Sequence, residues 1–172
     1  MHPTPTIRKE TAEDIPSIRA VVQAAFASAV EADLVDGLRR SGALTVSAVA
    51  VVGSRVVGHV AFSPVTIGGP HLALALAPVA VAPDCQRQGI GSALIRWGLE
   101  ECQRLGHGVV IVVGASAYYS RFGFRPASHL GIQCPFPVPP EAFMVLELSP
   151  GAASGCRGMV CYRPEFESVS TR

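Results

Sequence analysis

Residues 73–124 contain the order of elements that most constrains how this chain folds. An apolar strand, Ala73–Val81, is followed by Gln86-Arg-Gln-Gly-Ile-Gly-Ser92 and a helix, and a second apolar run leads to Tyr118-Tyr-Ser-Arg-Phe-Gly-Phe124. A strand that enters a glycine-bearing loop and then a helix places backbone N–H groups at the positive end of the helix dipole, where phosphates bind. The sequence therefore predicts an α/β domain with a phosphate-binding loop.

The spacing of apolar residues elsewhere predicts the remaining elements. These are a strand at 7–8, helices at 15–26 and 31–40, strands at 46–52 and 55–62, a helix at 90–106, a strand at 109–113, a short helix at 117–122, and strands at 143–148 and 158–162. Thr11 and Asp14 resemble a capping box before the first helix, and Gly53-Ser54 is typical of a hairpin turn. This order indicates a mixed sheet flanked by helices.

The length and composition favour one soluble catalytic or binding unit. With 172 residues and 49% hydrophobic residues, the chain is long enough for one well-filled core and too short for two ordinary domains. We expect a single domain over residues 1–166 and a frayed C-terminal tail over 167–172.

Charge and cysteine content exclude several classes of partner. The net charge is +1 without a Lys/Arg run, which argues against nucleic acid, and the apolar stretch at 72–82 is shorter than the roughly 20 residues of a membrane helix. The N-terminus lacks the pattern of a signal peptide.

The five cysteines have neither CxxC nor zinc-site spacing, so we expect no metal and interpret them as buried thiols in a reducing cytoplasm.

The glycine loop departs from two common nucleotide-binding motifs. A dinucleotide fingerprint would have glycine where this chain has Leu94, and a P-loop would need a lysine, whereas Lys9 is the only lysine. The alternative to a phosphate site is an ordinary strand-to-helix turn that binds nothing.

What remains is Gln86-x-x-Gly89-x-Gly91, which resembles the acetyl-CoA loop of the GCN5-related N-acetyltransferases (GNAT family). Tyr118-Tyr119-x-x-Phe122-Gly123-Phe124 is similar to the second signature of that family and stands at the family's spacing. The resemblance extends over nearly the whole chain and is greatest to the YhbS-like subgroup of predicted acetyltransferases. It implies a GNAT fold with a mixed central sheet of six to seven strands, about four flanking helices, and splayed fourth and fifth strands.

The resemblance also implies acetyl-CoA as co-substrate and no metal. The pantetheine chain would pair with the backbone of Val79 and Val81, with one N–H facing the thioester oxygen as an oxyanion donor. The loop residues expected at the pyrophosphate are Gln86, which would shape the turn, and Arg87, Gln88, Gly89, Ile90, Gly91 and Ser92. The guanidinium of Arg87 is expected either at a phosphate or in solvent. Tyr118 and Phe122 complete the predicted cofactor-binding set.

For the proton that the departing thiolate needs, the family commonly uses a tyrosine at the position of Tyr119. A phenol, with a reference pKa of about 10, is protonated at neutral pH and can therefore serve as the general acid. Consecutive helical residues point about 100° apart, so we expect only one of the two adjacent tyrosines to face the cofactor, and we assign Tyr119. The alternative is that either tyrosine is only packed in the core.

The general base is less evident, because the strands at 73–81 and 109–113 contain no Asp, Glu or His. The candidates are Glu31 and Asp33 at the start of the second helix and His59 in the third strand. Acids at a helix start also complement the helix dipole, and a sheet histidine is often merely hydrogen-bonded. Proton removal through water, or an amine that arrives neutral, is the further alternative.

These residues lead to one principal hypothesis and two alternatives. The principal hypothesis is an N-acetyltransferase in which a primary amine of a small molecule or peptide attacks acetyl-CoA directly in a ternary complex. One alternative is a non-catalytic acyl-CoA sensor; the other is transfer of a longer acyl group or to a hydroxyl, with the Pro-rich segment at 134–140 lining the pocket. Homodimers are common in the family, and the sequence leaves the oligomeric state and the acceptor open.

Overall fold

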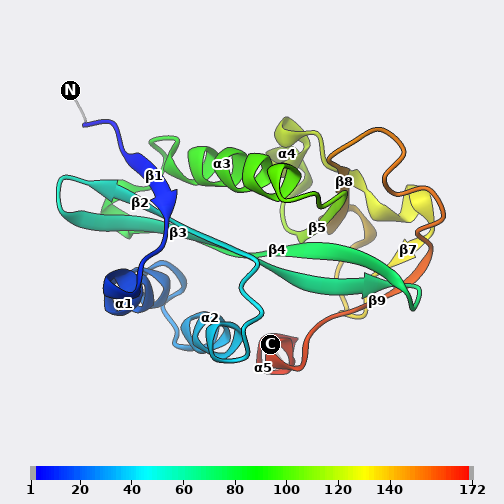
Figure 1. The fold of residues 1–172 in the computed structure, drawn as a ribbon, viewed down its shortest axis with the longest axis horizontal. Helices are drawn as coiled ribbons and strands as arrows, with labels where there is room; N and C mark the ends of the chain where they lie inside the picture. The colour runs from blue at the N-terminus through cyan, green and yellow to red at the C-terminus, as the bar shows by residue number, and fades with distance from the viewer. Residues whose placement is uncertain (1–2, 171–172) are drawn as a thin grey trace. The chain divides into compact units, whose positions relative to one another are not determined.

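The computed structural model describes residues 3–170, and the chain forms two compact units (Figure 1). Unit 1 comprises Met1–Ser63, Ala77–Glu101 and Glu165–Arg172, and unit 2 comprises Pro64–Leu76 and Cys102–Pro164. The third and fourth strands and the third helix contribute residues to both units.

The described residues form nine strands and five α-helices. The strands are β1 (Thr6–Lys9), β2 (Val46–Val52), β3 (Arg55–Ile67), β4 (His71–Val81), β5 (Val109–Val113), β6 (Arg125–Pro126), β7 (Ile132–Gln133), β8 (Phe143–Glu147) and β9 (Gly158–Cys161). The helices are α1 (Ile15–Phe26), α2 (Val30–Arg40), α3 (Ile90–Arg104), α4 (Ser116–Tyr119) and α5 (Glu167–Ser170). Short 3₁₀ helices are η1 (Ala12–Asp14), η2 (Pro83–Cys85), η3 (Ser120–Phe122), η4 (Ala127–Leu130), η5 (Pro140–Ala142) and η6 (Pro164–Phe166).

The predicted elements are confirmed, and the differences concern short or extended strands. β3 continues to Ile67, beyond the predicted end at residue 62, so it passes through Pro64. The two-residue strands β6 and β7 had no signal in the sequence. Residues 167–170 of the predicted tail form α5, and residues 171–172 lie outside the described part of the chain.

In unit 1, β1, β2 and β3 form an antiparallel sheet covered by helices on both faces. The β1–β2 pairing runs from Thr6–Val51 to Lys9–Ala48, and the predicted turn at Gly53-Ser54 joins β2 to β3. Figure 1 shows α1 and α2 on one face of this sheet and α3 on the other. The two helices pack against the sheet through a buried apolar cluster. This cluster includes Ile18 and Val22 of α1, Val35 of α2 and Val49 of β2.

The predicted capping box fixes the chain between β1 and α1. The Asp14 carboxylate accepts a hydrogen bond from the Thr11 backbone N–H at 2.7 Å, and Arg8 donates to both of its oxygens at 2.7 and 3.0 Å. The Arg8 guanidinium, as donor, holds the pKa of Asp14 far below its usual range. The ion pair therefore neutralises the buried carboxylate of Asp14, which follows the exposed residues Thr11, Ala12 and Glu13 at the start of the helix.

Glycine at position 98 lets α3 approach β3 closely. A Cβ at Gly98 would lie 2.3 Å from Cε2 of Phe62, a ring that is fully buried under the helix. Any larger side chain would have to move that ring or lift α3 from the sheet.

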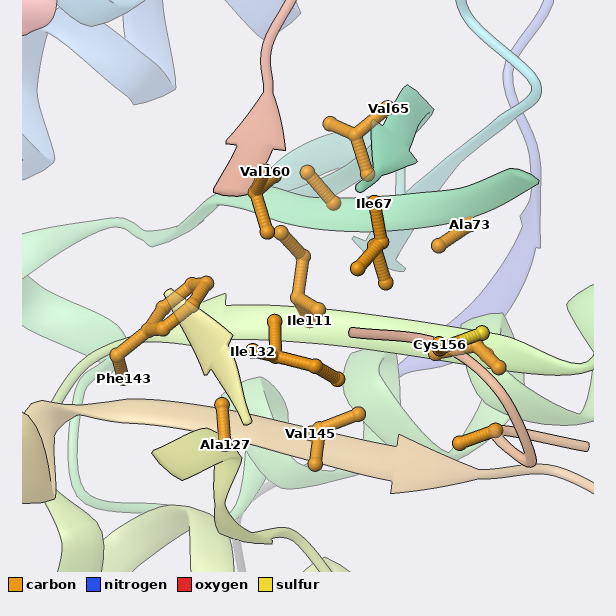
Figure 2. Packing of buried hydrophobic residues seen from close by; sticks show 13 residues of the cluster. Val65, Ile67, Ala73, Ile111, Ala127, Ile132, Phe143, Val145, Cys156 and Val160 are labelled. Atoms are coloured by element: carbon orange, nitrogen blue, oxygen red, sulfur yellow. The ribbon is translucent and has the colours of Figure 1, made fainter. Parts of the chain in front are cut away.

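Unit 2 has parallel and antiparallel strand pairs around a separate apolar cluster. β5 pairs in parallel with β4, through Leu74–Val110 and Ala75–Ile111, and antiparallel with β8 along its whole length. Figure 2 shows Ile67, Ile111 and Val145 converging on one core from three strands. The predicted mixed sheet flanked by helices is thus confirmed.

None of the five cysteines, all of which lie among the described residues, forms a disulfide, and they are not uniformly buried. Cys102 and Cys156 are buried, Cys85 and Cys134 are half-buried, and Cys161 is exposed. The prediction that all five are buried was wrong for Cys161, because it lies on the short strand β9, where its side chain points away from the core to which Val160 belongs.

Candidate functional site

The loop between β4 and α3 forms an exposed row of backbone groups in unit 1. Residues 86–89 are exposed, whereas Ile90, the first residue of α3, is buried. Arg87 and Gly89 both adopt positive φ angles, +62° and +84°. Left-handed residues next to a helix start turn successive N–H groups towards the same side, which makes a concave anion-binding surface. The sequence-predicted residues Gln86 to Gly89 therefore form a loop suited to a phosphate group, and the predicted residues Ile90, Gly91 and Ser92 form the first turn of the helix that follows it.

Side-chain contacts tie this loop to the strands below it. The Gln86 side-chain amide donates to the Val81 carbonyl at 3.0 Å, so the loop closes onto the last residue of β4. Just before it, Asp84 receives two 2.8 Å hydrogen bonds from Arg55, at the start of β3. These bonds lower the pKa of Asp84 to about 2, although the pair is exposed.

Gly58 is a supporting residue whose role the sequence reasoning missed. A Cβ there would lie 2.8 Å from the Leu94 side chain and 3.1 Å from the Ala80 carbonyl oxygen. Glycine thus allows β3, β4 and the first turns of α3 to meet directly beneath the loop. The signal was present in Val57-Gly58-His59, but glycine inside a strand does not by itself say which backbone approaches it.

Val79 and Val81, predicted to bind the pantetheine chain, lie on the part of β4 that belongs to unit 1. Both side chains are half-buried, and Ala80 between them is buried against the core formed with α1 and α2. Neither residue belongs to the ladder between β4 and β5, which pairs residues 74 and 75 of β4.

Tyr118, Tyr119 and Phe122 form an aromatic cluster in unit 2. The Tyr119 ring packs edge-on against Tyr118 at 5.1 Å and against Phe124 at 5.8 Å between ring centroids, and Tyr118 packs against Phe122 at 5.4 Å. The Arg121 guanidinium lies 4.5 Å from the centroid of the Tyr118 ring. The second sequence motif therefore brings its aromatic residues together.

Tyr119 is the more enclosed of the two tyrosines. Its side chain is buried, whereas that of Tyr118 is half-buried. Burial, with a smaller contribution from Tyr118, raises the pKa of Tyr119 to about 12. The phenol therefore keeps its proton throughout the neutral range.

His59, one predicted base, is completely buried in the sheet of unit 1. Its Nε2 lies 2.8 Å from the Ser47 hydroxyl, and its Nδ1 has no hydrogen-bond partner among the described residues. Burial, assisted by the positive charge of Arg39, lowers the pKa of His59 to about 3. The imidazole is neutral at pH 7 but a weak proton acceptor.

Glu31 and Asp33, the acidic candidates, differ in their surroundings although both lie in the first turn of α2. Glu31 is buried, whereas Asp33 is exposed and pairs with Arg19 at 2.9 Å. This surface ion pair accounts for an aspartate at this position without a role in substrate binding or catalysis. All base candidates, like the loop, belong to unit 1, whereas the predicted acid belongs to unit 2.

The described residues contain neither a metal-site grouping nor a helix that could span a membrane. Within residues 3–170, no three His, Cys, Asp or Glu side chains are grouped as a metal site would require. The helices of this same part of the chain are too short or too polar to span a membrane.

Comparison with known proteins identifies relatives over most of the chain. The family model described as "Acetyltransferase (GNAT) domain" matches residues 6–127. An uncharacterized N-acetyltransferase, YhbS of Escherichia coli strain K12, is 39% identical over 93% of this chain and 97% of its own.

Two solved structures are similar in fold as well as sequence. The crystal structure of E. coli YhbS in complex with CoA has a TM-score of 0.92 at 38% identity, covering 96% of this chain and 93% of that one. A GNAT family acetyltransferase from Brucella melitensis in complex with acetyl-CoA has a TM-score of 0.81 at 37% identity, covering 96% and 100%. The expected resemblance and fold are thus confirmed.

Proposed function

The chain belongs to the GNAT family of acetyltransferases, and from this premise we propose that it transfers an acetyl group from acetyl-CoA to a primary amine by direct attack in a ternary complex. The acceptor is a small-molecule or peptide amine. Residues 1–166 act as one N-acetyltransferase domain, and the five free cysteines fit a cytoplasmic protein.

The cofactor is held mainly by backbone groups. The pyrophosphate lies on the amides of residues 87–92, and the pantetheine chain pairs with the backbone of Val79 and Val81. One of these N–H groups donates to the thioester oxygen, where negative charge develops during attack. The observation that carries this proposal is the left-handed pair Arg87 and Gly89 at the start of α3, closed onto β4 by Gln86.

Tyr119 is the general acid that faces the leaving thiolate. With its pKa raised to about 12, the phenol is protonated when the thiolate forms. Because a thiol of pKa about 8.5 is the stronger acid, complete transfer is uphill, and the main contribution of Tyr119 is a hydrogen bond to the developing negative charge. Tyr118 and Phe122 border the cofactor on the same cluster.

Glu31 is the preferred base. A histidine whose pKa is lowered to about 3 cannot take a proton from an ammonium group efficiently, so His59 is the weaker candidate. Removal through water, or binding of an already neutral amine, is consistent with the same residues.

The burial of His59 also favours a second candidate function, an acyl-CoA sensor that binds the cofactor without transfer. The two are separated by measuring acetyl-CoA binding by calorimetry and CoA release over a panel of amines, alcohols and longer acyl-CoAs. Amine-dependent release supports transfer; binding without release on any acceptor supports the sensor.

The cofactor loop is tested in the same assays with Gly89→Val. A valine there favours relaxation of the free loop out of the left-handed region, and restoring that conformation on binding costs about 1–2 kcal/mol, so the dissociation constant for acetyl-CoA should rise about tenfold. Gly53→Val is the matched control, because Gly53 also has a positive φ, +62°, and open space around it, but lies in the β2–β3 turn. Equal affinities for both variants would contradict the assignment of the loop.

A further inference from the structure

Gly114, the residue directly after β5, is in contact with the proposed acid. A Cβ built on Gly114 would lie 2.3 Å from Cε2, 2.9 Å from Cδ2 and 3.4 Å from Cζ of Tyr119. Ordinary carbon contacts are about 3.5–4.0 Å, so the Tyr119 ring occupies the space that a side chain at 114 would need.

The backbone on both sides of this contact is fixed. The Gly114 N–H donates to the Ala142 carbonyl at 2.8 Å, and the Tyr119 N–H donates to the Ala115 carbonyl at 3.1 Å. Gly114 does not have a positive φ, so alanine is allowed by the backbone there, and the constraint is purely steric.

The other edges of the ring are also enclosed. Phe124 and Tyr118 meet it edge-on, with interplanar angles of 78° and 87°. A ring held on three sides loses little further freedom when a ligand binds, and its hydroxyl has a defined position.

We infer that Gly114 is a positioning residue: its missing side chain, together with Phe124, forms the slot that sets the place of the Tyr119 phenol relative to the leaving thiolate. This inference rests on the proposed function, because Gly114 affects the reaction only through the proposed acid, Tyr119. Gly114 itself does not touch the reacting atoms.

The test compares Gly114→Ala with Tyr119→Phe and with the double variant. A displacement of about 1 Å in a catalytic group can lower the rate about 100-fold, so Gly114→Ala should lower kcat by about that factor with little change in the KM for acetyl-CoA. In the Tyr119→Phe background the same substitution should lower kcat no further, because there is no hydroxyl left to misplace. An additive loss in the double variant would overturn the inference.

Gly108→Ala is the matched control, because it also introduces a crowded Cβ, but at the other end of β5. That Cβ would lie 2.9 Å from the Ala152 Cβ. The substitution should leave kcat unchanged. If Gly114→Ala does not fold, Phe124→Leu opens the slot without a clash and should lower kcat in the same non-additive way. Additivity there would equally contradict the slot.

A spectroscopic measurement separates this inference from the proposed function. The near-ultraviolet circular dichroism of the wild type minus that of Tyr119→Phe defines the Tyr119 band. Gly114→Ala should alter that band and Gly108→Ala should preserve it; an unaltered band would overturn the slot. A Tyr119→Phe enzyme with full activity would instead contradict the acid assignment, while the band still decides whether Gly114 positions the ring.

Discussion

His59 in the sheet of unit 1 and Tyr119 in the aromatic cluster of unit 2 are both titratable side chains shielded from water. The pKa of His59 is lowered to about 3, whereas that of Tyr119 is raised to about 12, and burial is the largest cause in both. Desolvation penalises the charged form, which is the imidazolium in one case and the phenolate in the other. Both groups are therefore neutral at pH 7.

The same physical effect weakens the tyrosine as an acid and the histidine as a base. The raised pKa of Tyr119 leaves the phenol protonated, so in its proposed role it can still donate a hydrogen bond to a leaving thiolate, whereas the lowered pKa of His59 removes the basicity that would let it accept a proton. Burial of a polar residue is thus not evidence for catalysis until the sign of its pKa shift is compared with its proposed role.

The largest expected effect comes from removing the Tyr119 hydroxyl. Tyr119→Phe keeps the ring and its packing but removes the proton donor, so kcat should fall about 10²–10⁴-fold while the KM for acetyl-CoA stays the same. Steady-state kinetics of CoA release measure both constants. Tyr162→Phe is the control, because Tyr162 is a half-buried tyrosine of unit 2 whose pKa burial also raises. A similar fall in kcat for Tyr162→Phe would mean that the effect of Tyr119→Phe is not specific to the proposed acid.

An intermediate effect is expected from His59, on stability rather than on rate. Its pKa in the folded protein, about 3, is below the value of about 6.5 in the unfolded chain, so between these values the unfolded state binds the additional proton. The free energy of unfolding should therefore decrease as the pH falls below 6.5, by up to about 1.4 kcal/mol per pH unit.

Urea denaturation at pH 7 and pH 5 measures this dependence in the wild type and in His59→Gln. Between pH 7 and pH 5, where most carboxylates remain ionised, the free energy of unfolding of His59→Gln should decrease less than that of the wild type. The kcat of His59→Gln should be higher than that of Tyr119→Phe. The same pH dependence in both proteins would show that His59 is not held in its neutral form by the fold.

The smallest effect is expected from the exposed Arg55–Asp84 pair beside the loop at 86–89. Arg55 lowers the pKa of Asp84 to about 2, so the pair stabilises the fold above about pH 4 and the contribution disappears as the pH falls towards 2. Because solvent screens both groups, Arg55→Gln should change the Tm by less than about 2 °C at pH 7. The Tm values of the wild type and of Arg55→Gln, measured from pH 7 to pH 2, test this. A large difference between them at pH 7 would contradict the argument that solvent exposure makes this pair weak.

The regular elements could be predicted because their apolar spacing is a local property of the chain. The extension of β3 to Ile67 could not, since Pro64 normally ends a strand and the continuation depends on long-range pairing, including that of Thr66 with Cys161 of β9. β6 and β7 are defined by their partners and are too short to have a periodicity of their own.

The candidate site could be predicted where it depends on a motif and not where it depends on packing. The loop and the aromatic cluster followed from residue types at fixed spacing. The contacts of Gly58 with Leu94 and of Gly114 with Tyr119 join separate elements, so no spacing in the sequence indicates them. The complete burial of His59 likewise requires knowing which helices cover its strand.

The contact between Gly98 and Phe62 has a consequence for transplanting the proposed cofactor loop to another scaffold. The loop keeps its direction because α3 lies close to β3, and that closeness depends on a glycine in the middle of the helix and on Gly58 in the strand. A graft of residues 86–92 alone would carry the sequence of the motif without the geometry beneath it. The smallest portable unit therefore includes Gly58, Phe62 and Gly98, three positions that a motif search would not select.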